Sequence, residues 1–455
     1  TVSGGTGFDI ILYQGTEAND TLTLSQAATT ITAAGLVAGT IEVSAADVER
    51  VDVLGEGGND TISGSNSVAI PMNIFGGLGN DNILGGASTD TIYGGFGNDT
   101  MIGAAGNDTI FGEDGNDLFG NPATTSNGVA DDPGADFFNG GDGIDQFVWE
   151  PGDGSDVIQG GVDGADILRF FGGAAADSFG LFPAAAAATH FNIILGAATV
   201  DTHGVEQINV TGLAGGDAFT IADLTTTEVA HVLVDVTAGD ADSVIVNGRD
   251  LDDNILISTD GAGTVNVLGL EYDVRLLNVA TGAGSDTLTV NGNDGIDLIK
   301  SVDGVEAQIN ISLSGGQGDD FLSADATLDG GAGDDFLEGG AGDDVINGGA
   351  GEDTMIGLGG ADTFDGGADF DTILIRGTSG NDVIVANQTA ATTLVHTVNG
   401  ATETDTLVTV AGVRTVERAR VDHFDLPAAA LQHVAAGEHA AGQRTARPSA
   451  RAAGH

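Results

Sequence analysis

Aspartates recur at every ninth residue in one stretch of the chain, and a large apolar residue follows each of them two places later. The stretch 330–374 is five consecutive units with no residue inserted or lost: GGAGDDFLE, GGAGDDVIN, GGAGEDTMI, GLGGADTFD and GGADFDTIL. Place six is Asp335, Asp344, Asp353, Asp362 and Asp371, and place eight is Leu337, Ile346, Met355, Phe364 and Ile373. Carboxylates at this density suit a hard divalent cation, because calcium takes about six to eight oxygen ligands.

A second run of five units, 76–120, repeats the pattern. Place six is Asp81, Asp90, Asp99, Asp108 and Asp117, and place eight is Ile83, Ile92, Met101, Ile110 and Phe119. Ser88 replaces a turn glycine, and Ala104 and Ala105 intrude in another turn. We therefore expect the block 330–374 to bind calcium more tightly than the block 76–120.

The spacing predicts a coil made of turns and short strands. Glycines at places one, two and four permit φ > 0 and hence a tight six-residue turn, and place eight points inward from the three-residue strand that follows. Two units make one coil of eighteen residues, so aspartates eighteen apart stack at the roughly 4.8 Å spacing of paired strands. Two such carboxylates repel by about 3 kcal/mol at an effective dielectric of 20, whereas burying one Leu or Ile contributes only about 1.5 to 3 kcal/mol. We therefore expect folding to require a bound cation.

The predicted metal ligands are the place-six carboxylates and the turns around them, and the predicted cofactor is calcium, in several copies. The carboxylates are Asp60, Asp81, Asp90, Asp99, Asp108, Asp117, Asp145, Asp320, Asp335, Asp344, Asp353, Asp362 and Asp371. The turn glycines are Gly76, Gly77, Gly79, Gly94, Gly95, Gly97, Gly330, Gly331, Gly333, Gly339, Gly340, Gly342, Gly348, Gly349 and Gly351.

The unit G-G-x-G-x-D-x-U-x, with U a large apolar residue, resembles the RTX, or hemolysin-type, calcium-binding repeats of secreted bacterial proteins. The resemblance implies a parallel β-roll that folds when it meets calcium outside the cell. A disordered, acidic, glycine-rich linker is the alternative, but a linker has no reason to keep an apolar residue at every eighth place. The segment 140–168 also resembles the repeat region of serralysin-type metalloproteases, whose zinc motif has no counterpart here.

Composition limits the partners. The 455 residues carry 68 acidic and 12 basic side chains, a net charge of −56, and no cysteine. This charge argues against nucleic acid and anionic membranes as partners, and the lack of cysteine leaves metal ions as the available cross-link. The longest low-charge run, 179–200, is interrupted by glycine and polar residues, so we predict no transmembrane segment. Because no leader-like segment follows Thr1, we expect the chain to be a piece of a longer protein.

The rest of the chain keeps the strand pattern without intact units. Aspartates eleven residues apart, such as Asp145 and Asp156, predict longer strands, and between 170 and 312 an apolar strand, a glycine turn and an aspartate recur, as at Asp217 and Asp286. We predict an all-β fold: a parallel β-roll or β-solenoid with tandem calcium-binding nonapeptide repeats and a degenerate β-rich middle.

Six segments follow from this pattern. They are an N-terminal β segment (1–62), a first calcium-binding block (63–168), the middle, which is a solenoid or a sandwich (169–313), a second calcium-binding block (314–385), a β segment (386–422) and a disordered tail (423–455).

The sequence carries no catalytic signature. H-E-x-x-H and G-x-S-x-G are missing, and His190, His203, His231 and His396 are scattered singly, which predicts surface or strand histidines rather than metal ligands. Carboxylates are so numerous that the proximity of two of them is no sign of glycoside hydrolysis.

We interpret the chain as non-enzymatic, with calcium binding coupled to the folding of a secreted structural or adhesive module. Contacts with a cell surface, or between copies of the chain, are the partner hypotheses. The rival is the non-catalytic calcium-binding region of a secreted protease or lipase whose catalytic domain lies outside this chain. A polysaccharide-active enzyme built on residues 170–312 ranks last, because that region has few aromatic residues for sugar stacking.

Overall fold

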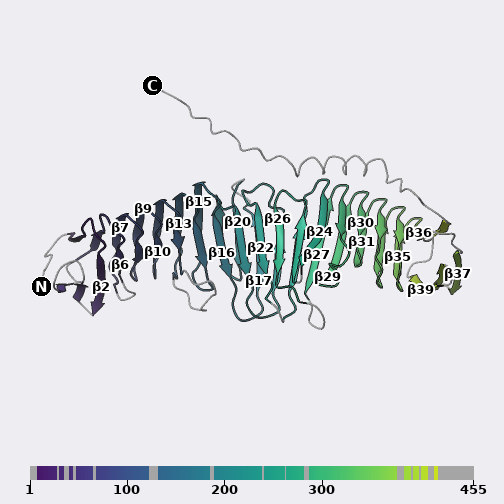
Figure 1. The fold of residues 1–455 in the computed structure, drawn as a ribbon, viewed down its shortest axis with the longest axis horizontal. Coiled ribbons are helices and arrows are strands. Elements are labelled where there is room, and N and C mark those ends of the chain that lie inside the picture. Colours follow the sequence, from purple (N-terminus) through teal and green to yellow (C-terminus); the bar gives the residue numbers. More distant parts are fainter. Residues whose placement is uncertain are drawn as a thin grey trace, which may run out of the picture. The chain divides into compact units, whose positions relative to one another are not determined.

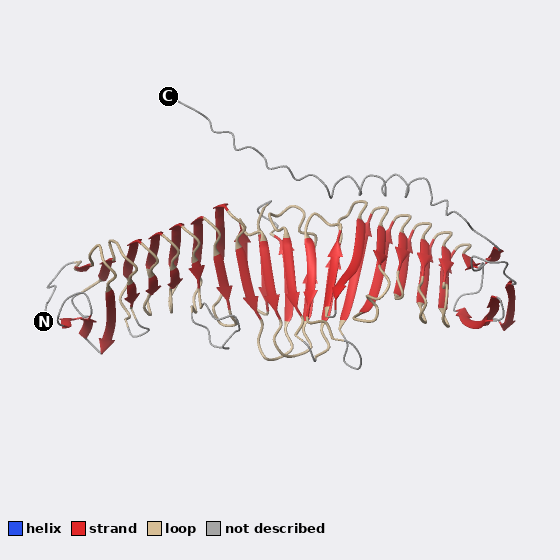
Figure 2. Ribbon diagram, viewed as in Figure 1, coloured by secondary structure: helices blue, strands red, loops and turns tan. Residues whose placement is uncertain are grey.

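The computed structural model describes residues 8–27, 30–34, 40–44, 48–64, 68–121, 132–184, 189–237, 240–261, 263–280, 286–376, 384–390, 393–398, 401–407 and 414–418. The predicted disordered tail, 423–455, lies outside these residues. Every regular element in the described ranges is a β-strand, which confirms the predicted all-β class (Figure 2). The described residues hold no helix that is long and apolar enough to cross a membrane.

The chain divides into two compact units. Unit 1 comprises Thr1–Arg249, Ile257–Asn291 and Val302–Ser312, and unit 2 comprises Asp250–Leu256, Gly292–Ser301 and Leu313–His455. The six segments drawn from the repeat pattern stay predictions.

Unit 1 contains strands of two β-sheets, which we call sheet A and sheet B. Sheet A consists of β2 (Thr21–Ala27), β3 (Thr30–Ala34), β4 (Thr40–Ser44), β6 (Thr61–Ser63), β8 (Asn82–Leu84), β10 (Thr100–Ile102), β12 (Leu118–Phe119), β14 (Gln146–Trp149), β16 (Ile167–Phe171), β20 (Gln207–Thr211), β22 (His231–Asp235), β25 (Thr264–Leu268) and β26 (Asp273–Leu277). Sheet B consists of β1 (Ile10–Gln14), β5 (Arg50–Leu54), β7 (Met72–Leu78), β9 (Thr91–Phe96), β11 (Thr109–Asp114), β13 (Phe137–Asp142), β15 (Val157–Asp163), β17 (Ser178–Pro183), β18 (Phe191–Leu195), β19 (Ala198–His203), β21 (Ala218–Ile221) and β23 (Ser243–Asn247).

Unit 2 also contains strands of sheet A and of sheet B. Its sheet A strands are β28 (Leu298–Ser301), β30 (Phe321–Ser323), β32 (Phe336–Glu338), β34 (Thr354–Ile356), β36 (Thr372–Arg376) and β40 (Arg414–Arg418). Its sheet B strands are β31 (Thr327–Ala332), β33 (Val345–Ala350), β35 (Thr363–Ala368), β37 (Ile384–Ala390), β38 (Thr393–Val398) and β39 (Ala401–Leu407). Three further strands, β24 (Asn254–Gly261), β27 (Thr287–Asp294) and β29 (Asn310–Gln317), have residues in both units.

Neighbouring strands in the repeat blocks come from successive coils and run parallel. In unit 1, Asn73 of β7 pairs with Thr91 of β9, and Thr91 pairs with Thr109 of β11. In unit 2, Val345 of β33 pairs with Thr363 of β35. Each partner is two nonapeptides further along the chain, which confirms the predicted eighteen-residue coil. Figure 1 shows β7, β9, β13 and β15 following one another in this order.

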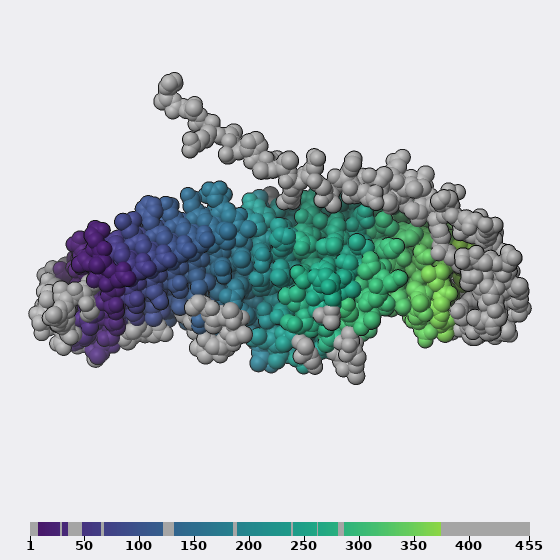
Figure 3. All heavy atoms as spheres, viewed as in Figure 1, coloured from purple at the N-terminus to yellow at the C-terminus, as the bar shows by residue number. Residues whose placement is uncertain are grey.

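The core is a stack of the apolar side chains at place eight. Ile83, Met101 and Phe119 are in register on β8, β10 and β12, and each is at most 1% exposed. All ten place-eight residues predicted to be buried are buried, because only the middle residue of each three-residue strand faces inward. In Figure 3 the coils of 76–120, in blue, lie tightly against one another.

Antiparallel excursions interrupt the parallel coils outside the nonapeptides. In unit 1, β18 pairs antiparallel with β17 and β19, and β25 pairs antiparallel with β26. Around them the parallel order continues, since β16 pairs with β20, β20 with β22, and β22 with β26. The degenerate middle therefore keeps the winding of a roll although its turn sequences have diverged.

The turn glycines serve two different purposes. Places two and four have positive φ in most units of the two blocks, as at Gly77 (113°) and Gly79 (125°), but place one does not. The prediction that place one also needs φ > 0 was wrong. A Cβ added to Gly76 at place one would lie 2.4 Å from Asp81 Oδ2, so glycine is needed there for space.

Place two keeps the left-handed conformation even without glycine. Ala104 (φ 71°), Glu113 (φ 74°) and Leu358 (φ 76°) all occupy it. The left-handed region costs a residue with a Cβ roughly 1–2 kcal/mol. The neighbouring coils determine the shape of these turns and hold them in this conformation despite the cost.

We expect Leu358→Gly to raise the free energy of unfolding of the calcium-loaded chain by about 1 kcal/mol. The side chain is 45% exposed, so little burial is lost. Leu251 is the matched control, because it is 65% exposed and its φ is not positive. Leu251→Gly should lower stability by roughly 0.5–1 kcal/mol. Denaturant unfolding measures both variants, and a loss of stability in Leu358→Gly would contradict the role given to place two.

Candidate metal centres

The place-six aspartates stack along each unit in two columns. Column A contains the turns that lead into sheet A, and column B contains those that lead into sheet B. In column A of unit 1, the backbone N–H of Asp81 donates to Asp99 Oδ1 at 2.7 Å, and that of Asp99 donates to Asp117 Oδ1 at 2.8 Å. Each carboxylate therefore fixes the aspartate of the preceding coil.

The same link runs beyond the intact nonapeptides. Column A of unit 1 joins Asp20, Asp60, Asp81, Asp99, Asp117, Asp145 and Asp166. Column B of unit 1 joins Asp90, Asp108, Asp136 and Asp156 and, further along, Asp177, Asp217, Asp242 and Asp286. The eleven-residue step from Asp145 to Asp156 is thus half a coil, from one column to the other.

In unit 2 the longer column is column A. It joins Asp253, Asp297, Asp320, Asp335, Asp353 and Asp371. Asp335 has carboxylate neighbours on both sides, because a shorter coil places Asp320 before it. Column B joins Asp344 to Asp362, and the coil before Asp344 offers only Ala326 at the equivalent place.

In eleven of these aspartates the second carboxylate oxygen is buried and has no hydrogen-bond partner. The atoms concerned are Oδ2 of Asp60, Asp81, Asp99, Asp108, Asp117, Asp136, Asp145, Asp297, Asp320, Asp335 and Asp353. A buried carboxylate oxygen without a donor is costly, since water has been removed and nothing replaces it. The recurrence of this arrangement in coil after coil indicates a missing positive partner.

In some turns the backbone N–H of place two satisfies that oxygen. At Gly86 and Gly340 φ is not positive, and the place-two N–H donates to Oδ2 of Asp90 at 2.6 Å and of Asp344 at 2.8 Å. We call such turns closed; those at Thr16 and Gly173 are built the same way. Turns with positive φ at place two and an unpartnered Oδ2 are called open, as at Asp81 and Asp335.

Each open turn presents more than one oxygen to the same space. A Cβ added to Gly315 would lie 2.2 Å from Asp320 Oδ2 and 2.6 Å from the carbonyl oxygen of Gly330. Gly76 has the same surroundings, with Asp81 Oδ2 at 2.4 Å and the carbonyl oxygen of Gly94 at 2.5 Å. Two acceptors cannot satisfy each other, so this cradle of carboxylate and carbonyl oxygens fits a hard cation such as calcium.

Burial raises the pKa of these carboxyl groups. The ordinary value is 3.8, and desolvation together with the neighbouring carboxylates raises the pKa of Asp335 to about 8 and that of Asp297 to about 7. In unit 1 the same causes raise the pKa of Asp117 to about 7 and that of Asp136 to about 8. The metal-free columns therefore bind protons near neutral pH.

All of the predicted aspartate ligands lie in these columns. Those in column A are Asp60, Asp81, Asp99, Asp117, Asp145, Asp320, Asp335, Asp353 and Asp371, and those in column B are Asp90, Asp108, Asp344 and Asp362. The predicted glycines occupy the turns 76–81, 94–99, 330–335, 339–344 and 348–353. Their role as metal ligands stays a proposal.

Several column members escaped the sequence analysis. The recurring glycine turn before a strand could have identified Asp166, Asp242 and Asp297, whose units are imperfect nonapeptides. Asp132 is different, because it is buried beside Asp108 and Asp136 at a point where the repeat is interrupted. No repeat signal identifies it.

Two of the histidines expected to lie singly are paired in the structure. The rings of His190 and His203 stack with centroids 4.1 Å apart, and His190 Nδ1 lies 3.0 Å from Asp201 Oδ1. His231 Nδ1 lies 2.6 Å from Asp273 Oδ1 on the neighbouring strand. Three of the four are on or beside strands, as predicted, and the side chain of His396 lies outside the described residues.

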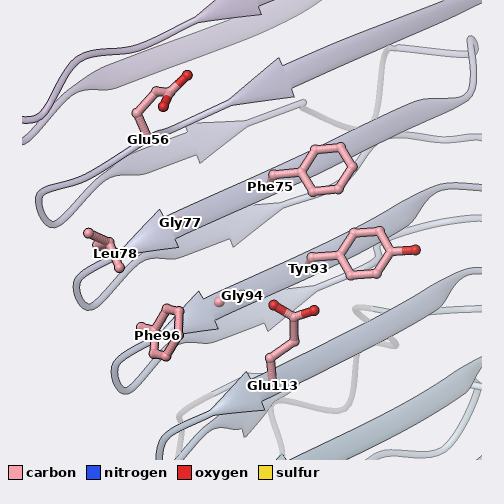
Figure 4. A pocket seen from close by; sticks show the side chains of 9 residues that line it. Glu56, Phe75, Gly77, Leu78, Tyr93, Gly94, Phe96 and Glu113 are labelled. Carbon is pink, nitrogen blue, oxygen red and sulfur yellow. The ribbon is translucent and has the colours of Figure 1, made fainter.

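A shallow recess of about 250 Å³ lies on sheet B of unit 1, near Tyr93 and Glu113 (Figure 4). It is smaller than the roughly 300–1,000 Å³ of usual ligand pockets. Tyr93 is stacked between Phe75 and Phe111, with centroids 4.9 and 5.0 Å away, so both of its ring faces are covered. Tyr93 therefore offers no free ring face on which a sugar could stack, and Phe96, which is 58% exposed, is the more accessible ring of the recess.

Comparison with known proteins identifies the repeat. The family described as RTX calcium-binding nonapeptide repeat (4 copies) matches residues 53–67, 73–101, 93–119, 323–355 and 338–373. No curated protein matches the chain. Among solved structures, the extracellular lipase LipA from Serratia marcescens aligns with 15% identity and a TM-score of 0.15, over 83% of this chain and 44% of the lipase chain. The alignment thus spans less than half of the lipase.

We expect Asp335→Asn to weaken calcium binding more than Asp344→Asn. Asp335 has an unpartnered Oδ2 and carboxylates in both adjacent coils, whereas both oxygens of Asp344 accept backbone hydrogen bonds. Asparagine keeps the shape and one oxygen acceptor, but it removes the charge and replaces the other oxygen by an NH2 donor. The calcium midpoint of the full chain, followed by circular dichroism, should rise on the order of tenfold for Asp335→Asn and less for Asp344→Asn. An equal or reversed order would contradict the division into open and closed turns.

Stability should depend on pH in the direction opposite to that of salt-bridged aspartates. Because the folded-state pKa of Asp335 is raised to about 8 from 3.8, the folded chain binds more protons than the unfolded chain between those values. Without calcium, stability should therefore rise as pH falls from about 8 toward 4. Protons compete with the cation, so the calcium midpoint should also rise as pH falls. Titrations at pH 8 and 5.5 that gave the same midpoint would contradict this.

Proposed function

Because the chain carries RTX calcium-binding nonapeptide repeats in an all-β parallel roll, we propose that it binds several calcium ions and that binding drives its folding. The observation that carries the proposal is the series of buried, unpartnered Oδ2 atoms, which recurs along column A of both units. These oxygens have lost their water and have no donor, so the metal-free fold is penalised at each open turn.

The open turns are the proposed binding sites. In unit 1 the ligands are Asp60, Asp81, Asp99, Asp117 and Asp145, and in unit 2 they are Asp297, Asp320, Asp335 and Asp353. Carbonyl oxygens at place one of the next coil, such as those of Gly94 and Gly330, complete the sets. When bound, calcium supplies the positive charge and the oxygen coordination that the stacked carboxylates lack.

The proposed biological role is that of an extracellular structural or adhesive module. A chain of net charge −56 that needs a cation at many turns stays unfolded where calcium is scarce and folds where it is abundant, and extracellular calcium modules work at roughly 10⁻⁴–10⁻³ M. This supports secretion before folding. Cell-surface contacts and self-association remain the proposed partners. A catalytic signature in any sequence joined to this chain would favour the calcium-binding region of a secreted enzyme over a structural module.

The direct test is folding of the full chain with and without calcium. Circular dichroism should change from coil to β on adding millimolar calcium to chelator-treated protein at pH 7.5. Magnesium should substitute poorly, because it holds its water and requires a rigid octahedral shell. A spectrum that is already fully β in excess chelator would contradict the proposal.

A further inference from the structure

We propose that Asp108, Asp132 and Asp136 bind one calcium ion at a site that no nonapeptide supplies, and that this is the tightest site of unit 1. The inference rests on the proposed calcium-dependent folding, but it adds a ligand, Asp132, outside the repeat pattern. Asp132 occupies place two of the turn that ends at Asp136, where intact repeats have glycine.

The three carboxylates converge. Each offers an oxygen atom, and these atoms all lie within 4.8 Å of one another. Asp108 and Asp136 are 2% exposed and Asp132 is 3% exposed. Within the part of the chain that the structure describes, this is the one group of three or more Asp, Glu, His or Cys side chains that meets such a distance limit.

In each carboxylate one oxygen accepts a hydrogen bond from a backbone N–H, and the other oxygen has no donor. The N–H of Asp90 donates to Asp108 Oδ1 at 2.7 Å, that of Asp108 to Asp136 Oδ1 at 2.6 Å, and that of Gly103 to Asp132 Oδ2 at 3.2 Å. The remaining oxygens, Asp108 Oδ2, Asp136 Oδ2 and Asp132 Oδ1, are buried and unpartnered. The backbone has thus oriented three carboxylates and left one oxygen of each unsatisfied.

Two of these free oxygens face the same glycine. A Cβ added to Gly103 would lie 2.4 Å from Asp108 Oδ2 and 2.8 Å from Asp132 Oδ1. Gly103 is the place-one residue of its turn, so this is the cradle of the open turns with one more carboxylate facing it. Asp132 therefore adds a full negative charge at place two, where the repeat pattern calls for glycine.

The donor set selects the class of cation. Three carboxylates without nitrogen or sulfur suit a hard ion, calcium or a lanthanide, rather than zinc or copper. Magnesium fits less well, because it keeps its water and demands octahedral geometry. Calcium affinity rises with the number of charged ligands, so this site should be tighter than those with two carboxylates. The alanines in turn 103–108 predicted weak calcium binding at this turn. The added carboxylate of Asp132 reverses that expectation for this one site.

The site has a built-in reporter. Trp149 is the single tryptophan of the chain, and its indole N–H donates to the carbonyl oxygen of Gly154 at 3.2 Å. Gly154 is paired with Gly134, which lies between Asp132 and Asp136 in sequence. Tryptophan excitation should therefore sensitise terbium bound in this part of column B more than terbium bound elsewhere.

The test is a terbium titration of the full chain, with tryptophan excitation, for wild type and two variants. Asp132→Asn removes one charge without changing shape, and Asp132→Gly restores the glycine of the repeat. Asp142→Asn is the control, since Asp142 is an exposed aspartate at the end of β13 and belongs to neither column. We expect the tightest tryptophan-sensitised phase to weaken about 10- to 100-fold in both Asp132 variants and to be unchanged in the control. Calcium should displace the same phase.

The outcomes separate this inference from the proposed function. A tight phase that survives both Asp132 variants, in a chain that still folds with calcium, would overturn the inference alone. A wild-type chain that binds no terbium and is indifferent to calcium would overturn both. If Asp132→Asn does not fold, Asp132→Gly provides the test. A site made only of repeat ligands would bind terbium as tightly or more tightly with glycine at this position, whereas the proposed site would bind it more weakly.

Discussion

Repulsion between stacked carboxylates is the constraint on which the rest of this structure depends. In the intact repeats, coils of eighteen residues bring Ile83, Met101 and Phe119 into register in the core. The same register places one aspartate behind another, and the backbone N–H of each fixes one oxygen of the next. The other oxygen is left buried without a donor. The packing that stabilises the coil therefore also creates the charge that opposes it.

The turns meet that constraint in two ways. In closed turns the place-two N–H satisfies the carboxylate internally, as at Asp90 and Asp344. In open turns φ at place two is positive and the oxygen has no partner, as at Asp81 and Asp335. Because Glu113 adopts the strained conformation without being glycine and Oδ2 of Asp117 in its turn is unpartnered, neighbouring coils impose the open form there. Calcium dependence is thus a property of the stack as much as of one turn.

Regular spacing is what made the coil predictable from sequence. The nine-residue period predicted the coil length, the inward position of place eight and the stacking of Asp335 with Asp353, because each depends only on counting along an uninterrupted repeat. Contacts that depend on coils of unequal length were not predicted. Asp320 reaches Asp335 through a coil of fifteen residues, and Asp132 reaches Asp108 across an interruption of the repeat. Place one was misread because its glycine leaves room for a neighbour's oxygen, which no local pattern reveals.

Amide hydrogen exchange at the place-six backbone N–H groups tests the central claim most directly. Each of these groups donates to the carboxylate of the next coil, so its protection reports whether the stack has formed. At pH 7.5 the account predicts that the N–H groups of Asp81, Asp99, Asp335 and Asp353 are protected in millimolar calcium and exchange as in an unfolded chain in excess chelator. Equal protection in the two conditions would show that the carboxylates stack without a cation, and would contradict the account.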